Sequence, residues 1–153
     1  MTTATADALW FINDLARIHL AGERVGGRLA IVEFSAPAGD MPPLHRHQRE
    51  DELFYILEGR VTIHQPGRRT VAEAGISVFT ERGVPHAYEV SKDGPARFLV
   101  IVTPAGFEEF VAQVSRPAEA VRLPEPSAPD AEKLAAIAAR FGIDLLGPPG
   151  TLP

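Results

Sequence analysis

Three histidines and one glutamate have the residue types and the spacing of a metal site. His45 and His47 are separated by one residue, and Glu52 follows them after a polar turn. His86 stands directly after a proline and opens a later apolar stretch. Side chains two positions apart in an extended chain point to the same face, so the first two imidazoles can converge on one ion. Three neutral imidazoles and one carboxylate suit one divalent transition metal ion (Fe, Mn, Ni, Co, Zn or Cu) and leave coordination positions open for water or substrate.

Each of these residues also has an explanation that needs no metal. A His-x-His pair beside Arg46 and Arg49 is often a solvated polar turn, so the prediction depends on all four residues together. His19 and His64 are expected to have no metal role. The chain has no cysteine, which excludes disulfides, thiolate metal sites and cysteine nucleophiles.

The composition is that of an ordinary globular domain. The chain has 153 residues, of which 45% are hydrophobic and 23% charged, and this size suits one domain with a real core. The formal net charge of −5 argues against general nucleic-acid binding, which needs clustered Lys and Arg. No basic segment followed by an apolar one opens the chain, and no apolar run is long enough to cross a bilayer. We therefore expect a cytoplasmic location and no membrane partner.

The elements that would position the four residues are short strands broken by Gly, Pro and Asp. The expected strands are rich in β-branched and aromatic residues, and they comprise Ala30–Phe34, Leu53–Leu57, Val61–His64, Ser77–Thr80 and Phe98–Val102. Many short strands at regular spacing predict an antiparallel sandwich or barrel. No internal repeat is visible, so one barrel is expected.

The pattern changes after Pro104. Apolar residues at helical spacing predict a short helix over Phe107–Val114, and the Pro-rich segment Arg116–Pro129 predicts an extended strap. A second helix is expected with Ser127 as its N-cap, an apolar stripe and a stop at Gly142. Residues 147–153 are expected to form a loose tail.

The spacing of the four candidate ligands resembles the two motifs of the cupin superfamily. The first motif, G-x5-H-x-H-x3–4-E-x6-G, is matched at every fixed position by Gly39, His45, His47, Glu52 and Gly59. The second, G-x5-P-x-G-x2-H-x3-N, is matched by Gly75, Gly83 and His86, whereas Glu81 and Val90 replace the usual proline and asparagine. Among the neighbouring carboxylates, only Glu52 keeps the six-residue gap to Gly59, so Glu50 and Asp51 are interpreted as solvated turn residues.

The resemblance implies a fold and an assembly. The expected fold is all-β: a cupin, a jelly-roll-like antiparallel β-barrel, with short C-terminal helices. Residues 1–104 would form the barrel, and residues 105–153 a helical and Pro-rich extension packed on it. The chain as a whole resembles small single-domain bacterial cupins described as quercetin-dioxygenase-like. Members with this barrel commonly pair, so a homodimer is expected, with the apolar segment Leu9–Ile12 needing a partner surface.

Strand alternation predicts the residues around the metal. Phe54 and Ile56 share a face with Glu52, and Tyr88 and Val90 share a face with His86. The substrate pocket is therefore expected to be mostly apolar, with Tyr88 as a polar group. Such a pocket suits a small aromatic or enol-bearing ligand better than a sugar phosphate.

Three functions fit these residues. The first is a metal-dependent dioxygenase, in which the resemblance implies that Glu52 leaves the metal to take a substrate proton. The second is an isomerase, cyclase or decarboxylase that uses the metal as a Lewis acid without O₂. The third is a small-molecule-binding cupin without catalysis.

Overall fold

Alternating burial along three long strands builds the interior of this protein. In the computed structural model, which describes residues 7–153, strand β3 (Ala30–Ala36) buries every second side chain. Strand β10 (Ala96–Thr103) does the same, and β5 (Asp51–Glu58) turns Glu52, Phe54 and Ile56 inward. Because successive side chains of a strand point to opposite faces, this pattern gives each strand one core face and one outer face.

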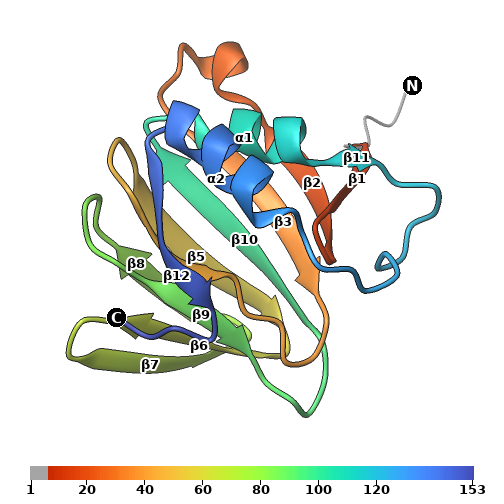
Figure 1. Ribbon diagram of the computed structural model, residues 1–153, viewed down its shortest axis with the longest axis vertical. Helices are drawn as coiled ribbons and strands as arrows, with labels where there is room; N and C mark the ends of the chain where they lie inside the picture. Colours follow the sequence, from red (N-terminus) through yellow and green to blue (C-terminus); the bar gives the residue numbers. More distant parts are fainter. Residues whose placement is uncertain (1–6) are drawn as a thin grey trace.

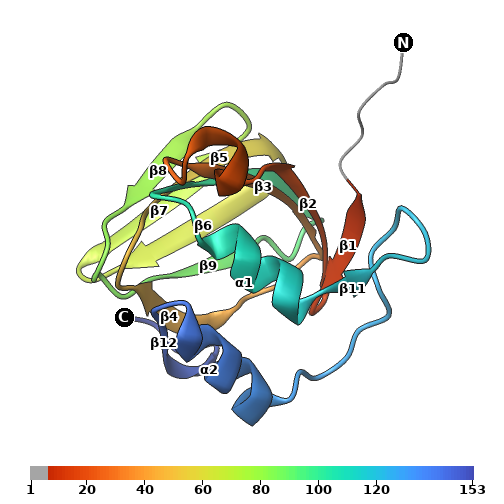
Figure 2. The ribbon, with the colours of Figure 1, turned by 90° about the horizontal axis from the view of Figure 1, so that it is seen from above.

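These strands form the middle of a seven-stranded sheet with the order β11-β1-β2-β3-β10-β5-β8. Its other members are β11 (Arg116–Pro117), β1 (Ala8–Phe11), β2 (Asp14–Leu20) and β8 (Ser77–Thr80). A second sheet has the order β7-β6-β9 and contains β7 (Arg68–Glu73), β6 (Arg60–Gln65) and β9 (Ala87–Val90). A third pairs β4 (Pro43–His47) with β12 (Ile143–Pro149). Every strand pair is antiparallel, and the sheets wrap around a common interior (Figures 1 and 2).

The all-β barrel with two short helices confirms the predicted fold class. All five expected strands are present, and helix α1 (Phe107–Val114) has the expected bounds. Strands β2 and β7 were not predicted, because Asp14–Leu20 and Arg68–Glu73 carry charges and lack a clean alternation. A short 3-10 helix, η1 (Gly22–Val25), links β2 to β3. No helix within residues 7–153 is long and apolar enough to span a membrane.

The second helix, α2 (Ala131–Arg140), begins later than expected. Its N-cap is Asp130, whose carboxylate accepts the Lys133 backbone N–H at 3.0 Å, so the assignment of Ser127 as the cap is wrong. Ser127 instead donates its backbone N–H to the Asn13 side chain at 2.9 Å. The helix ends as predicted, with Gly142 in the left-handed region at φ +70°.

The expectation of a loose C-terminal tail is wrong for residues 147–149. They belong to β12, which pairs along β4 with Ile143 opposite His47 and Leu145 opposite His45. The predicted extension therefore supplies a strand of the barrel wall as well as a helical cover. Helix α1 contacts β3 and α2 contacts β12, and the two helices contact each other across one side of the barrel (Figure 2).

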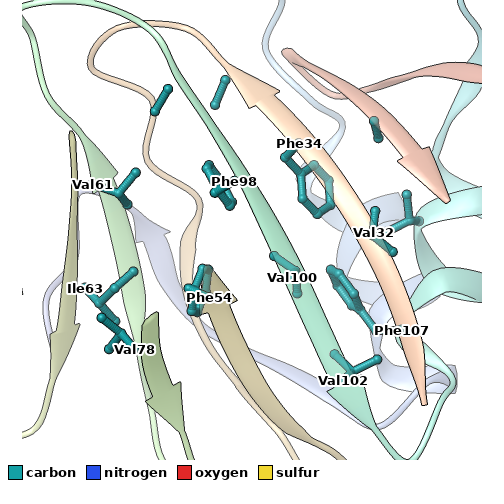
Figure 3. Close-up of a cluster of buried hydrophobic side chains, with 14 of the residues drawn as sticks. Val32, Phe34, Phe54, Val61, Ile63, Val78, Phe98, Val100, Val102 and Phe107 are labelled. Carbon is teal, nitrogen blue, oxygen red and sulfur yellow. The ribbon is translucent and has the colours of Figure 1, made fainter. Parts of the chain in front are cut away.

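The core lies between the inner faces of the sheets. Phe34, Phe54 and Phe98 lie in a row across three neighbouring strands, with Phe34 and Phe98 ring centroids 5.9 Å apart (Figure 3). Val61 and Ile63 of β6 face them from the second sheet, and both are completely buried. Burying such side chains stabilises the fold by about 1.5–3 kcal/mol each.

Gly59, which ends the first motif, sits where no other residue fits. Its φ is +80°, and a Cβ built on it would lie 2.5 Å from the Pro95 carbonyl oxygen and 2.9 Å from the Ala96 Cα. The tight β5–β6 connection therefore needs glycine both for its backbone conformation and for the close approach of the strand opposite.

We expect Gly59→Ala to lower the free energy of unfolding by about 3 kcal/mol or more, because backbone strain and a backbone clash add. Gly67→Ala is the matched control: φ there is +67°, but nothing lies within 4 Å of the added methyl group. It should cost only about 1–2 kcal/mol, the strain alone. Equal losses of stability for the two variants in denaturant unfolding would contradict the role assigned to close approach.

Candidate metal centre

Two strands and one backbone bridge bring the four predicted ligands together. His45 and His47 come from β4, and Glu52 comes from β5. His86 precedes β9 and forms an isolated antiparallel bridge with His45, with backbone N–H···O distances of 3.1 and 2.8 Å. One ligand atom from each of the four side chains lies within 4.8 Å of the others. His47, Glu52 and His86 are buried, whereas His45 is partly exposed.

Each imidazole is held at its Nδ1 atom by an acceptor outside the cluster. Nδ1 of His45 donates to the Pro43 carbonyl at 2.8 Å, and Nδ1 of His86 donates to the Val84 carbonyl at 3.1 Å. Nδ1 of His47 donates to the Glu50 carboxylate at 2.8 Å. Because each acceptor holds the ring proton on Nδ1, a neutral ring has its lone pair on Nε2, where it can bind a metal.

The Nε2 atoms face one carboxylate oxygen. Oε2 of Glu52 lies 2.8 Å from His86 Nε2 and 3.5 Å from His47 Nε2. The latter Nε2 is buried and has no hydrogen-bond partner within residues 7–153. A proton or a metal ion must therefore lie between His86 Nε2 and the Glu52 carboxylate, and the unpartnered Nε2 of His47 needs a cation or a donor in the same buried space. The donor set therefore fits a divalent metal held by His45, His47, Glu52 and His86.

The electrostatics of the cluster favour the same occupant. Burial and the neighbouring His86 and His47 lower the pKa of His45 to about 3, so this imidazole is neutral and free to ligate near pH 7. Burial alone would raise the pKa of Glu52, but the charge of His47 and the hydrogen bond from His86 outweigh it and lower this pKa to about 2. Burial lowers the pKa of His47, yet Glu52 and Glu50 raise it above its ordinary value. The pocket thus stabilises a negative carboxylate and attracts positive charge.

Glu50 is not the solvated turn residue that was predicted. It is 3% exposed and accepts a hydrogen bond from His47 Nδ1, so it orients this ring from the side opposite the Nε2 atom. The turn before β5 folds this side chain inward, while Asp51 faces solvent and pairs with Arg82 at 3.0 Å. The three-residue spacing between His47 and Glu50 is compatible with this contact. The sequence holds no other signal that would distinguish the role of Glu50 from that of Asp51.

The other two histidines lie outside the cluster, as expected. His64 on β6 pairs with Glu89 at 3.2 Å, and His19 on β2 pairs with Glu33 at 2.8 Å near the surface. Neither is among the residues that could share an ion.

A cavity of about 70 Å³ opens beside three of the ligands, His45, His47 and Glu52. Phe54 and Tyr88 line it, as the alternation of their strands predicted. Ile56 and Val90 do not: both are completely buried in the core, about 13 Å along their strands from the ligand positions. Sequence reasoning missed that the far wall comes from distant elements, with Phe107 and Phe110 of α1, Leu134 of α2, and Ile143 and Leu145 of β12.

Tyr88 has two carboxylate partners that sequence reasoning also missed. Its hydroxyl lies 3.2 Å from Asp14 Oδ2 and 3.1 Å from Asp40 Oδ2. These residues are 74 and 48 positions away in the chain, and no spacing signal connects them. The predicted polar group of the pocket is therefore part of a larger acidic cluster.

By fold and by site, the chain is an antiparallel β-barrel with a candidate metal centre of three histidines and a glutamate beside a mostly apolar cavity. The family described as "Cupin domain" matches residues 32–102, the range that carries β3 to β10 and all four ligands. This part of the chain is a cupin domain.

Individual relatives agree with that assignment. Quercetin 2,3-dioxygenase of Bacillus subtilis is 26% identical over 129 residues, covering 84% of this chain and 38% of that protein. The oxalate-binding protein of Thermotoga maritima is 33% identical over 66 residues, covering 43% of this chain and 54% of that protein. The chain thus spans between about a third and just over half of the length of these two relatives. The polyketide cyclase RemF from Streptomyces resistomycificus superposes with a TM-score of 0.57 at 23% identity, over 82% of this chain and 88% of that one, which shows the shared fold.

We expect His47→Ala to abolish stoichiometric metal binding, because it removes a ligand from a buried four-residue set. Glu50→Gln should keep the ion but weaken its binding by about 10–100-fold, the usual effect of disturbing the partner of a ligating imidazole. Elemental analysis after metal loading and competition with a chelator measure the two effects.

The matched control is His64→Ala, which removes a buried imidazole outside the cluster and should leave one ion per chain. A His47→Ala protein that still holds one tightly bound ion would show that the ligands are wrongly assigned.

Proposed function

We propose that this cupin is a metal-dependent dioxygenase that acts on a small phenolic or enol-bearing compound. The observation that carries the proposal is the pairing of a three-histidine, one-carboxylate donor set with a small and mostly apolar cavity. Pockets that bind drug-sized ligands have volumes of about 300–1,000 Å³, so a cavity of about 70 Å³ favours a compact molecule.

The metal, one divalent ion among Fe, Mn, Ni, Co, Zn and Cu, would supply Lewis acidity toward an enol or phenol oxygen. The redox-active members of this set would also supply a route for electrons to O₂, which Zn²⁺ would not. The chain's own residues bind and orient the substrate. Phe54 and Phe107 present aromatic walls, and His47 packs edge-on against Phe107 with ring centroids 5.3 Å apart. These walls exclude water from the reacting group and keep it beside the ligands.

Glu52 has a second role in this proposal, as the base that takes the substrate proton. Glu52 is the only carboxylate among the four ligands, so it can leave the ion and still act as a base. Thr80 Oγ1 lies 3.4 Å from its Oε2 and would give the released carboxylate a hydrogen-bond partner. Its neighbours Phe54 and Thr80 are buried, so a carboxylate that turns from the metal to the substrate stays in a poorly solvated environment, where its basicity rises.

The similarity to quercetin 2,3-dioxygenase supports oxygen chemistry, although the size of the cavity favours a smaller substrate than a three-ring flavonol. The second candidate is an isomerase, cyclase or decarboxylase that uses the same metal without O₂. The third is a binding protein without turnover, a role for which the similarity to an oxalate-binding protein is the specific support.

The test of the main proposal is oxygen consumption by protein loaded separately with each of the six metals. We expect O₂ uptake with a small β-diketone such as 2,4-pentanedione or with a small phenol such as catechol, and less with quercetin. Substrate loss without O₂ uptake would favour the second candidate, and saturable binding without turnover the third.

Glu52→Gln keeps the size of the side chain and an oxygen ligand but removes the basic group. We expect the metal to be retained and turnover to fall by about 10²–10⁴-fold, the usual contribution of a general base. Near wild-type turnover by a metal-loaded Glu52→Gln protein would remove the proton-transfer role. The matched control is Asp51→Asn, a change in the adjacent carboxylate, which lies on the opposite face of β5 and pairs with Arg82, and which should leave turnover unchanged.

We also propose that two chains pair through the outer face of the seven-stranded sheet. The sequence-based argument for a dimer does not hold, because β1 pairs with β2 and β11 of the same chain and Trp10 is buried.

A different feature supports pairing. An apolar row crosses four neighbouring strands in register, and its members are Ile31, Ile101, Leu53 and Phe79. Phe79, on the edge strand β8, is 52% exposed.

Light scattering at micromolar concentration should give twice the chain mass of 16.5 kDa. Phe79→Asp should shift the protein to a monomer that still binds metal, because it places a charge within the proposed interface, at the most exposed side chain of the row. Val121→Asp, at a side chain 71% exposed on the strap, should leave the dimer intact. A wild-type mass of 16.5 kDa would contradict the proposal.

A further inference from the structure

Asp14 is a buried carboxyl group that has no cationic partner within residues 7–153. It is 4% exposed, and its Oδ1 atom is buried with no hydrogen-bond partner within residues 7–153. Its Oδ2 atom lies 3.2 Å from the Tyr88 hydroxyl, and its carboxyl group also interacts with that of Asp40. Buried Asp residues are normally paired with a cation, because an unpaired polar group costs free energy when it leaves water.

A second carboxyl group shares the same phenol. The Tyr88 hydroxyl lies 3.1 Å from Asp40, but it carries one proton and can donate to only one of the two carboxylates at a time. Burial raises the pKa of Asp14, and the nearby charge of Asp40 raises it further. Burial also raises the pKa of Asp40. When both carboxyl groups are ionised, their four oxygens have the Tyr88 hydroxyl and the Met41 backbone N–H as donors, so the acceptors outnumber the donors.

These side chains line a small pocket of about 80 Å³ that has no positive charge of its own. Its lining includes the Phe11 and Tyr88 rings together with prolines and Met41, and no lining residue, all of which lie within 7–153, is Lys or Arg. Aromatic faces carry partial negative charge and attract cations, as the carboxyl groups do. Tyr88, Phe11 and Ile12 also line the metal cavity, so the two spaces share a wall.

The backbone holds the pocket in a conformation that costs energy. Asp14 follows a two-residue turn in which Ile12 has φ +55°, the left-handed region that β-branched residues avoid. Strain of this kind costs about 1–3 kcal/mol and is concentrated at functional sites. On the opposite side, Asp40 is fixed to β9 by the Val90 N–H, which donates to its carbonyl at 2.9 Å.

We propose that Asp14, Asp40 and Tyr88 form a binding site for a primary ammonium group, placed on the wall of the metal cavity. An ammonium ion has three donors and one positive charge, which supply the hydrogen bonds and the counter-charge that these acceptors lack. A metal ion is a poorer occupant, because the only His, Asp and Glu group within residues 7–153 that could hold one is His45, His47, Glu52 and His86.

This inference deepens the proposed function and rests on it in one respect only. If the metal site takes an enol or phenol oxygen, the substrate that also fits the acidic pocket is a small amine bearing such an oxygen. The ammonium site itself needs no metal and no turnover, so it is tested by binding alone.

The experiment is calorimetric titration of the whole protein, metal-free and metal-loaded, with propylammonium chloride. Its neutral isostere 1-propanol and potassium chloride are titrated in parallel. We expect saturable binding of propylammonium with an affinity at least about tenfold higher than that of 1-propanol, the effect of charge-assisted hydrogen bonds. Equal binding of 1-propanol, equal binding of potassium, or no saturation by propylammonium would each overturn the proposal.

Two variants locate the site. Asp14→Asn and Asp40→Asn keep size and hydrogen-bonding capacity but remove charge, and each should weaken propylammonium binding by about tenfold or more. Asp93→Asn, whose side chain is 88% exposed elsewhere, is the matched control and should bind like the wild type. Loss of thermal stability in both variants with unchanged propylammonium binding would show that the cluster is only a tether between β2 and β9. If Asp14→Asn fails to fold, the Asp40→Asn variant and the comparison with 1-propanol still test the ammonium site.

If metal-loaded protein turns over no enol or phenol but propylammonium binds as described, the proposed function fails and the ammonium site stands. If turnover is found and propylammonium does not bind, the ammonium site fails alone.

Discussion

The hydrogen bonds at the Nδ1 atoms of three imidazoles are the constraint on which the site depends. They fix the protonated nitrogen of each ring against a carbonyl or a carboxylate, and so they fix the direction of every Nε2 lone pair. Two of the three acceptors are carbonyls two residues before the histidine that they hold, at Pro43 and Val84. The ligand directions are thus built into the backbone path of two short segments, and the barrel needs only to bring those segments together.

The barrel meets that requirement through pairing over long sequence distances. The His45–His86 bridge joins β4 to the approach of β9, and β5 is held between β10 and β8 in the large sheet. Core side chains behind the ligands, Phe54 and Phe98 among them, leave little freedom for these strands to shift. The same packing that stabilises the fold also sets the small volume of the cavity, so fold stability and ligand size are linked.

The sequence was informative wherever residue type and local spacing decide the outcome. The His-x-His pair, the strand periodicity around Phe54 and the helix Phe107–Val114 all follow from neighbours within a few positions. It was uninformative where distant segments decide. Whether Asp14 meets Tyr88 and whether residues 147–149 pair with β4 depend on contacts that span up to about a hundred positions. Ile56 is an intermediate case. The sequence predicted correctly that its side chain points inward, but it did not show that this position lies too far along the strand to reach the cavity.

The pairing of β12 with β4 has a consequence for how the ligands come together during folding. Within residues 7–153, β12 is the strand that pairs along β4, which carries His45 and His47. Contacts between such distant segments form slowly, because closing a long loop costs entropy before it is rewarded. We therefore expect the ligand strand to acquire its covering strand late in folding, after the pairs that join segments closer in the sequence.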